Sequence, residues 1–165
     1  MGEVRQLPRP YRRFLGLISD HAPVTRAFMR AATAVDPILL KLSGGRVSLP
    51  LGLPTLLLRT TGARSGEPRE APLLYAPDGD RIVLIASQGG APRNPAWYHN
   101  LVAHPECEVL ATHERSGNYI ARQAEGEERE RLWRIAIAVY SGYDTYAARA
   151  GERRIPVMVL ERTQA

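Results

Sequence analysis

Short apolar runs bounded by turn-forming residues recur along most of the chain, and each run predicts a β-strand. Asp78-Gly79 predicts a tight hairpin between two of these strands, and Ser116-Gly117-Asn118 predicts a turn between two others. The final run is apolar throughout, which is typical of a strand in the centre of a sheet. The predicted strands are residues 55–58, 71–75, 81–86, 106–112, 119–123 and 155–160.

Two segments between these strands carry helical signals. Residues 126–140 begin with acidic side chains and place apolar residues on one side, as a helix does. Asn94 and Pro95 predict the N-cap and the first residue of a shorter helix that runs to about Ala103. Short strands in hairpins, with helices inserted or appended, predict a mainly β protein of the α+β class, built as a closed antiparallel barrel rather than a parallel sheet.

The N-terminal segment, residues 1–45, mixes cationic and apolar residues with partial helical periodicity at 12–18 and 24–42. Such a segment can pack its apolar side on the barrel or lie on an anionic membrane surface, and we favour packing. No apolar run approaches the roughly 20 residues that would cross a membrane, and no secretory signal is recognisable. We expect a single domain with its barrel at 46–165. We expect it in the cytoplasm, with peripheral contact at the inner face of the plasma membrane as the alternative.

Composition narrows the function classes. The 165 residues are 44% hydrophobic, which is enough for one core, and the net charge of +5 arises in the first 70 residues, with eleven basic and five acidic side chains. Arginine outnumbers lysine 21 to one, so only the position of an arginine is informative. Because Cys107 is the single cysteine of the sequence, an internal disulfide and a cysteine metal cluster are excluded. Scattered histidines and the lack of a nucleic-acid module predict no metal and no nucleic-acid partner.

A glycine-bearing loop, residues 60–66, separates the first two predicted strands. Gly62 and Gly66 allow a positive φ and a close backbone approach, and neighbouring hydroxyl groups add donors to the backbone N–H groups. Arg64 and Arg69 lie five residues apart across the turn, and a guanidinium group is a planar fork suited to phosphate or carboxylate. The loop is either an anion site or a glycine-rich hairpin with solvated arginines.

A second loop, residues 87–90, leads towards the start of the short helix, which is again a place for an anion or an electron-rich ligand edge. Trp97 and Asn100 share a face at helical spacing, so an aromatic plane and an amide could meet one ligand. A tryptophan in this position is otherwise part of the core.

Three tyrosines, Tyr140, Tyr143 and Tyr146, are spaced by three in a segment that Ser141 and Gly142 predict to be a bent loop or a helix end. At this spacing the rings are expected to follow one side of the chain without stacking. They can line a pocket with apolar rings while offering hydroxyl groups to a polar substrate, or they can cap the barrel core.

Three segments in this order, TTGARSGEPR, IASQGGAPRNPAWYHNL and the spaced tyrosines, resemble the deazaflavin-dependent nitroreductase and quinone reductase family of actinobacteria. The resemblance covers residues 50–161, which is most of the chain. It implies a split β-barrel of the flavin-reductase-like, FMN-binding type. It also implies binding of coenzyme F-420, an 8-hydroxy-5-deazaflavin with a phosphate and an oligoglutamate tail.

Carried over residue by residue, the resemblance implies that Arg64 and Arg69 meet the phosphate and the tail. Tyr143 would stand near the hydride-donating face, and Tyr140 and Tyr146 would shape the substrate pocket, so these three tyrosines are the implied catalytic residues. The implied cofactor contacts are Ala63, Arg64, Ser65, Arg69, Glu70, Ala71, Pro72, Leu73, Leu74, Ile85, Ala86, Ser87, Gln88, Ala96, Trp97, Tyr98, His99, Asn100 and Tyr143.

The chain departs from the best-known member of that family, which has a lysine where this chain has Gln88 and a tyrosine where it has Leu74. Cofactor affinity and acceptor range are therefore expected to differ. We expect hydride transfer from reduced deazaflavin to a quinone, a nitro compound or an activated alkene such as an enone, with Tyr143 or a tyrosine-held water supplying the proton. The alternatives are an FMN-dependent reductase or oxidase and a non-catalytic barrel that stores the cofactor or carries a lipid. The sequence leaves the oligomeric state open.

Overall fold

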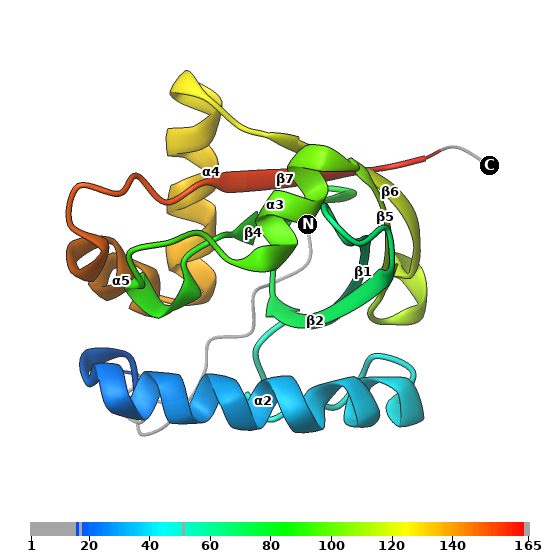
Figure 1. Ribbon diagram of the computed structural model, residues 1–165, viewed down its shortest axis with the longest axis horizontal. Coiled ribbons are helices and arrows are strands. Elements are labelled where there is room, and N and C mark those ends of the chain that lie inside the picture. Colours follow the sequence, from blue (N-terminus) through cyan, green and yellow to red (C-terminus); the bar gives the residue numbers. More distant parts are fainter. Residues whose placement is uncertain (1–15, 17, 51, 164–165) are drawn as a thin grey trace.

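The computed structural model describes residues 16, 18–50 and 52–163. In this part of the chain, seven strands form one antiparallel sheet that curls on itself (Figure 1). The strand order is β2-β1-β5-β6-β7-β4-β3, which confirms the predicted antiparallel β architecture. The strands are β1 (Thr55–Thr61), β2 (Pro68–Leu74), β3 (Ala76–Asp78), β4 (Arg81–Ile85), β5 (Glu106–Leu110), β6 (Gly117–Gln123) and β7 (Val157–Arg162).

Strands β4 and β7 are buried on both faces, which explains their nearly unbroken apolar sequences. On β4, Ile82 and Leu84 belong to a core cluster inside the curl of the sheet, whereas Val83 and Ile85 belong to a second cluster beneath the helices. Residues 157–160 of β7 alternate between the same two clusters. β7 pairs with β6 on one side and β4 on the other, so the prediction of a central final strand is confirmed.

Several predicted strand ends are wrong by a few residues. β2 begins at Pro68 rather than at residue 71, because β1 continues to Thr61 and pairs that residue with Pro68. Arg69 therefore lies in a strand. The predicted turn at 116–118 is replaced by a 3-10 turn, η2 (His113–Arg115), because the Ser116 hydroxyl and the Ala111 backbone bond to each other and close the connection there.

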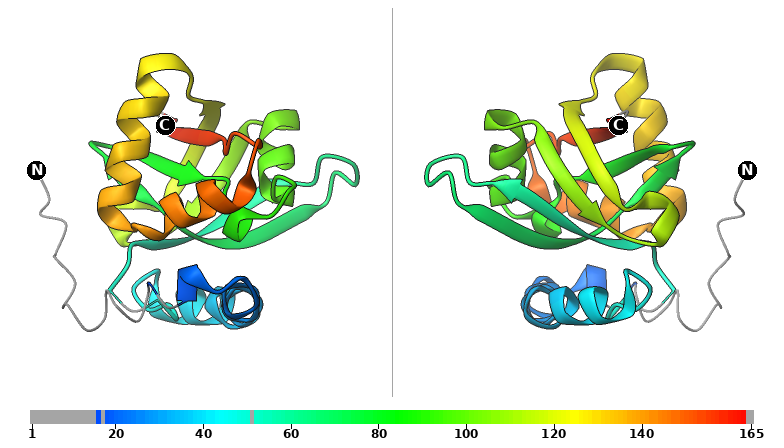
Figure 2. Two further views of the ribbon diagram at one scale, coloured as in Figure 1. Left: turned by 90° about the vertical axis from the view of Figure 1, so that its left-hand side faces the viewer. Right: turned by 90° about the vertical axis from the view of Figure 1, so that its right-hand side faces the viewer.

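Two of the helices flank the curled sheet on opposite sides, α3 on one and α4 on the other (Figure 2). The predicted N-cap of the short helix is wrong by one position, since Pro95 occupies the cap. The side-chain oxygen of Asn94 instead accepts a hydrogen bond from Arg153 at 2.5 Å. The bounds are α3 (Ala96–Ala103), α4 (Gly126–Val139) and α5 (Gly142–Ala150).

Helix α2 (Ala22–Ser43) forms a separate layer beneath the sheet in Figure 1 and contacts β1, β2 and the 3-10 turn η1 (Gln88–Gly90). It ends where Gly44 adopts a left-handed conformation with φ 61°. The next residue, Gly45, packs so closely that a Cβ atom there would lie 1.9 Å from the carbonyl oxygen of Ala111. The end of α2 is thereby fixed against the end of β5.

The predicted helical segment at 12–18 falls mostly outside the described residues. Within those that are described, no helix combines the length and the apolarity needed to cross a membrane.

Candidate functional site

A cavity of about 460 Å³ lies between α2 and the curled sheet. The sheet contributes Leu84 and Ile85, α3 contributes Trp97, and α2 contributes Phe28 and Met29 from the other side. This volume is within the range of small-molecule and cofactor sites. Because these walls are apolar and partly aromatic, the cavity suits a flat ring system.

The loop between β1 and β2 is held in place by Asn100 from α3. The Asn100 Oδ1 atom accepts a hydrogen bond from the Ala63 backbone N–H at 3.0 Å, and its Nδ2 atom donates one to the Thr60 hydroxyl at 3.0 Å. Asn100 is buried, and both ends of its amide are engaged. The side chain therefore supports the loop between β1 and β2, and the contact with a ligand beside Trp97 stays a prediction.

Arg64 and Arg69 are both exposed on this hairpin. The Arg69 guanidinium donates hydrogen bonds to the Ser65 hydroxyl and to the Pro68 carbonyl, each at 3.3 Å. Within the described residues, neither arginine forms an ion pair with a carboxylate. Their guanidinium groups are therefore available to an anion outside the cavity, at the tip of the hairpin.

The loop after β4 turns sharply at Gln88, whose φ of 47° is unusual for a residue other than glycine. Ser87, Gln88 and Gly89 line the cavity. The following residue, Gly90, also has a positive φ, of 77°, and a Cβ atom there would lie 2.7 Å from the Tyr146 carbonyl oxygen. Glycine is required here because α5 packs directly against the loop.

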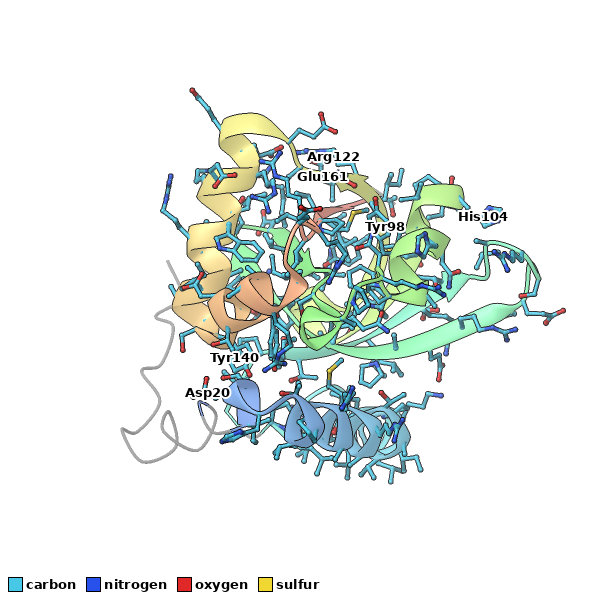
Figure 3. The ribbon with its side chains drawn as sticks, turned by 60° about the vertical axis from the view of Figure 1, so that its left-hand side comes forward. Asp20, Tyr98, His104, Arg122, Tyr140 and Glu161 are labelled. Atoms are coloured by element: carbon cyan, nitrogen blue, oxygen red, sulfur yellow. The ribbon has the colours of Figure 1, made fainter. Side chains whose placement is uncertain are left out.

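The three tyrosines gather at one end of the cavity. Their ring centroids lie 5.2 Å (Tyr140–Tyr143), 6.0 Å (Tyr140–Tyr146) and 6.3 Å (Tyr143–Tyr146) apart, with interplanar angles of 87°, 56° and 75°. The rings are thus in edge-on or tilted contact and do not stack, as expected from their spacing. Tyr140 is the C-cap of α4, which confirms the predicted helix end, and Tyr143 and Tyr146 lie in a second helix, α5, that begins at Gly142. The Tyr140 and Tyr146 hydroxyl groups are 3.0 Å apart. In Figure 3, Tyr140 lies on the side that faces α2, next to Asp20.

Burial raises the pKa of all three phenols above the usual value of 10. For Tyr140 and Tyr143, a neighbouring tyrosine raises the pKa further. The Tyr143 hydroxyl makes no hydrogen bond within the described part of the chain, and Tyr143 lines the cavity. These residues are consequently neutral hydrogen-bond donors at physiological pH, and weaker acids than free tyrosine.

The sequence-predicted residues fall into two groups around this cavity. Those that line it are Glu70, Ala71, Pro72, Leu73, Leu74, Ile85, Ser87, Gln88, Ala96, Trp97, Tyr140, Tyr143 and Tyr146. Those that lie outside it are Ala63, Arg64, Ser65, Arg69, Ala86, Tyr98, His99 and Asn100. Tyr98 turns away towards β6, where its hydroxyl bonds to Gln123 at 2.8 Å, and Figure 3 shows it far from Tyr140.

Sequence reasoning missed the wall that α2 provides, including Asp36, the one acidic residue in that helix. Asp36 is 1% exposed and accepts a hydrogen bond from the Leu49 backbone N–H at 2.7 Å. Desolvation raises the pKa of its carboxyl group above 3.8, and the Leu49 bond opposes this more weakly. The nearby Glu70 carboxylate also lines the cavity, but Lys41 at 2.7 Å holds its pKa below the usual value. A lone acidic residue in a cationic, apolar helix was the signal available in the sequence.

Metal-ligating and nucleophilic side chains are not gathered at this cavity. Among residues 16, 18–50 and 52–163, no group of three or more His, Cys, Asp or Glu side chains could hold a metal ion. Cys107 is buried, and burial raises the pKa of its thiol to about 12, which makes it unreactive.

A curled antiparallel sheet with an apolar, aromatic cavity and neutral phenol donors is the architecture of a split-barrel protein with a site suited to a planar ring compound. The family model described as F420H(2)-dependent quinone reductase matches residues 34–162. The chain belongs to this family, and its cofactor is coenzyme F-420.

Similar proteins agree with this assignment. An F420H(2)-dependent quinone reductase of Mycobacterium tuberculosis is 41% identical over 125 residues, which cover 73% of this chain and 83% of the relative. A solved structure of an F420-H2 dependent reductase aligns with a TM-score of 0.59 and 37% identity, covering 66% of this chain and 94% of the other. A solved chain described as a domain-swapped dimer aligns with a TM-score of 0.62 and 33% identity, covering 77% and 96%. The predicted split barrel and cofactor are confirmed, and the FMN alternative is not favoured.

Proposed function

We propose that this protein transfers a hydride from reduced coenzyme F-420 to a quinone. The observation that carries the proposal is one continuous cavity that joins two of the predicted cofactor segments, around β2 and the β4 loop, to the three tyrosines. A cofactor ring and an acceptor ring can therefore lie against each other in the same cavity, which is what direct hydride transfer requires.

The residues present fit this cofactor. A planar ring finds apolar contacts at Leu73, Ile85 and Trp97, and the cavity volume of about 460 Å³ is of the right order for ring systems. The phosphate and the acidic tail would extend to Arg64 and Arg69 on the hairpin, where guanidinium groups suit such anions. When bound, the reduced cofactor supplies the hydride, while the protein binds and orients both rings and excludes water.

Tyr143 is proposed to hold the acceptor. Because burial raises the pKa of its phenol, Tyr143 stays protonated and donates a hydrogen bond to the acceptor oxygen on which negative charge develops. The raised pKa makes Tyr143 a reluctant acid, so the proton that completes the reduction comes from this phenol or from a water held by Tyr140 or Tyr146. Tyr140 and Tyr146, whose hydroxyl groups are 3.0 Å apart, fix the ring of Tyr143 by packing against it.

The first experiment is a titration of the protein with oxidised coenzyme F-420 and, separately, with FMN, followed by quenching of tryptophan fluorescence. Trp97 lines the cavity, and both it and Trp133, whose ring centroid lies 6.4 Å from that of Tyr143, contribute to the signal. Selective saturation by the deazaflavin supports the proposal, whereas selective binding of FMN overturns it. Turnover is then measured with a quinone, a nitro compound and an enone, and binding without turnover of any acceptor would instead support a storage or carrier protein.

Two variants test the assigned roles. Tyr143→Phe keeps the ring and removes the donor, so kcat should fall about tenfold or more while cofactor affinity changes little. Unchanged turnover would remove Tyr143 from the mechanism.

Arg64→Ala should weaken cofactor binding more than it lowers kcat. The matched control is Arg134→Ala, because Arg134 is an exposed arginine on α4 away from the cavity. Equal affinities of these two arginine variants would rule out the anion role of the hairpin.

We further propose that α2 brings the cavity to a membrane that holds lipophilic quinones, at the inner face of the plasma membrane. The outward side of α2 carries an apolar stripe at helical spacing, in which Val35, Ile38 and Leu42 are 40%, 59% and 83% exposed. Exposed Arg26 and Arg30 on the same helix would complement anionic lipids. Sedimentation with vesicles of anionic lipid should recover the protein, and Ile38→Glu with Leu42→Glu should abolish recovery. Recovery that is equal for this double variant refutes the idea.

A further inference from the structure

Two arginines bond to the loop that follows β4, and neither of them lines the cavity. Arg149, in α5, donates a hydrogen bond to the Gly89 carbonyl oxygen at 2.8 Å. Arg153 follows α5 and contacts four oxygen atoms of the same loop. These acceptors are the Ala91 carbonyl at 2.8 Å, the Ser87 carbonyl at 2.7 Å, the Ala86 carbonyl at 3.2 Å and the Asn94 side-chain oxygen at 2.5 Å.

Neither guanidinium is neutralised by a carboxylate within the described residues, because every oxygen that Arg149 or Arg153 contacts there is a carbonyl or an amide oxygen. Both side chains are partly buried. Desolvation lowers the pKa of Arg153 from its usual value, as expected for a cation without a compensating charge. Two positive charges are therefore held against one short loop without a neutralising carboxylate among the described residues.

The same contacts decide which polar groups the loop presents on its other side. The Gly89 carbonyl accepts a hydrogen bond from Arg149, and the Ser87 carbonyl accepts one from Arg153 and one from the Gly90 N–H within the turn. Among the described residues no acceptor is found for the N–H groups of Gln88 and Gly89. Ser87 is right-handed, with φ −72° and ψ −39°, and Gln88 is left-handed, with φ 47°. Successive residues of these two kinds turn their N–H groups into one concave, anion-binding surface.

We propose that Arg149 and Arg153 are positioning residues that hold the Gln88 and Gly89 N–H groups as a cradle for an electron-rich edge of the cofactor ring. The ligand class is a planar heterocycle with a carbonyl or an anionic atom at its edge. The inference deepens the proposed function and rests on it. The Ser87 and Gly89 carbonyl groups would repel such an edge, but both accept hydrogen bonds from the arginines. The positive charges of the two arginines also favour an electron-rich edge at the N–H groups.

Arg149 extends this arrangement beyond the loop. Its second nitrogen donates a hydrogen bond to the Ser19 carbonyl oxygen at 2.6 Å, and the guanidinium lies over the Tyr146 ring, 5.7 Å from the centroid. One side chain thus joins the cofactor loop, the start of the N-terminal helical region and a tyrosine of the acceptor site.

The test compares Arg149→Met, Arg149→Lys and Arg153→Met with Arg154→Met. Arg154 is the matched control, because it is adjacent in sequence, carries the same charge and is 67% exposed, with Glu130 as its partner. Circular dichroism and thermal unfolding first establish which variants fold. The dissociation constant of oxidised coenzyme F-420 and the absorption spectrum of the bound cofactor are then measured. In the cofactor-free proteins, amide hydrogen exchange is followed at residues 87–91.

Arg149→Met should weaken cofactor binding about tenfold or more, move the bound spectrum towards that of the free cofactor and speed exchange in the loop. Arg149→Lys keeps the charge and should recover part of the spectral effect. If Arg149→Met and Arg153→Met match Arg154→Met in affinity, spectrum and exchange, the proposal is overturned. If Arg153→Met does not fold, the comparison of Arg149→Met and Arg149→Lys with Arg154→Met decides whether the proposal holds. If the unsubstituted protein does not bind the cofactor, the proposed function and the cradle fail, while exchange still decides whether the arginines hold the loop.

Discussion

Replacement of Asn100 by alanine tests whether one buried amide organises the cofactor hairpin. The variant removes two hydrogen bonds of 3.0 Å, one to the Thr60 hydroxyl and one from the Ala63 N–H. Each such bond contributes about 1 kcal/mol, and the buried hydroxyl loses a partner, so we expect a loss of about 2–3 kcal/mol in the free energy of unfolding. For a domain of this size that is a fall of about 5–10 °C in Tm.

The functional effect should be separable from the loss of stability. Urea unfolding gives the stability, and fluorescence titration of the folded variant gives the dissociation constant of coenzyme F-420. That constant should rise about tenfold, because the freed loop must be ordered again on binding. Thr60→Val is the matched control, since it breaks the strand contact while Asn100 still holds Ala63. An Asn100→Ala protein that is no less stable than Thr60→Val and binds the cofactor with unchanged affinity would refute the reasoning.

Three further predictions concern other parts of the molecule. Because the folded-state pKa of Asp36 is raised above 3.8, the wild-type protein should lose stability as the pH rises from that value through the raised pKa, and Asp36→Asn should abolish this loss in urea unfolding at a series of pH values. Gly142→Ala would place a Cβ atom 2.4 Å from the Tyr140 ring, so activity should fall, and stability should fall by about 1–3 kcal/mol; unchanged kinetics would contradict this. Hydrogen bonds, first from Arg131, lower the pKa of Asp78 to about 2, so Arg131→Gln should be less stable above pH 3.8, and the difference should vanish as the pH falls towards 2.

The strand pattern could be predicted from the sequence because a buried strand requires a run of apolar residues. β4 is apolar at residues 82–85 and β7 at residues 157–160, since both faces of the sheet are covered there. The ends of the strands were less predictable. Pro68 extends β2 towards the loop because of its partner on β1, and pairing of this kind depends on residues that are distant along the chain.

The site was predictable in its segments and less so in its contacts. Spacing along a helix placed Trp97 and Asn100 on one side, and it could not show that the Asn100 amide is directed at Thr60 and Ala63. The role of Arg153 could not be predicted either, because arginines are numerous in this chain and the acceptors of Arg153 lie about sixty residues earlier in the sequence. The resemblance to a known family supplied the list of candidate residues, and the three-dimensional contacts separate those that line the cavity from those that support it.

The wall that α2 gives to the cavity has a consequence for how acceptor range can evolve and be engineered. The family model begins at residue 34, whereas Phe28 and Met29, which face the cavity, precede it in the chain. Part of one side of the pocket thus lies before the segment that the family model matches, while the cofactor loops lie inside that segment. Exchanging this helix between relatives should transfer acceptor preference as a module and leave the cofactor unchanged.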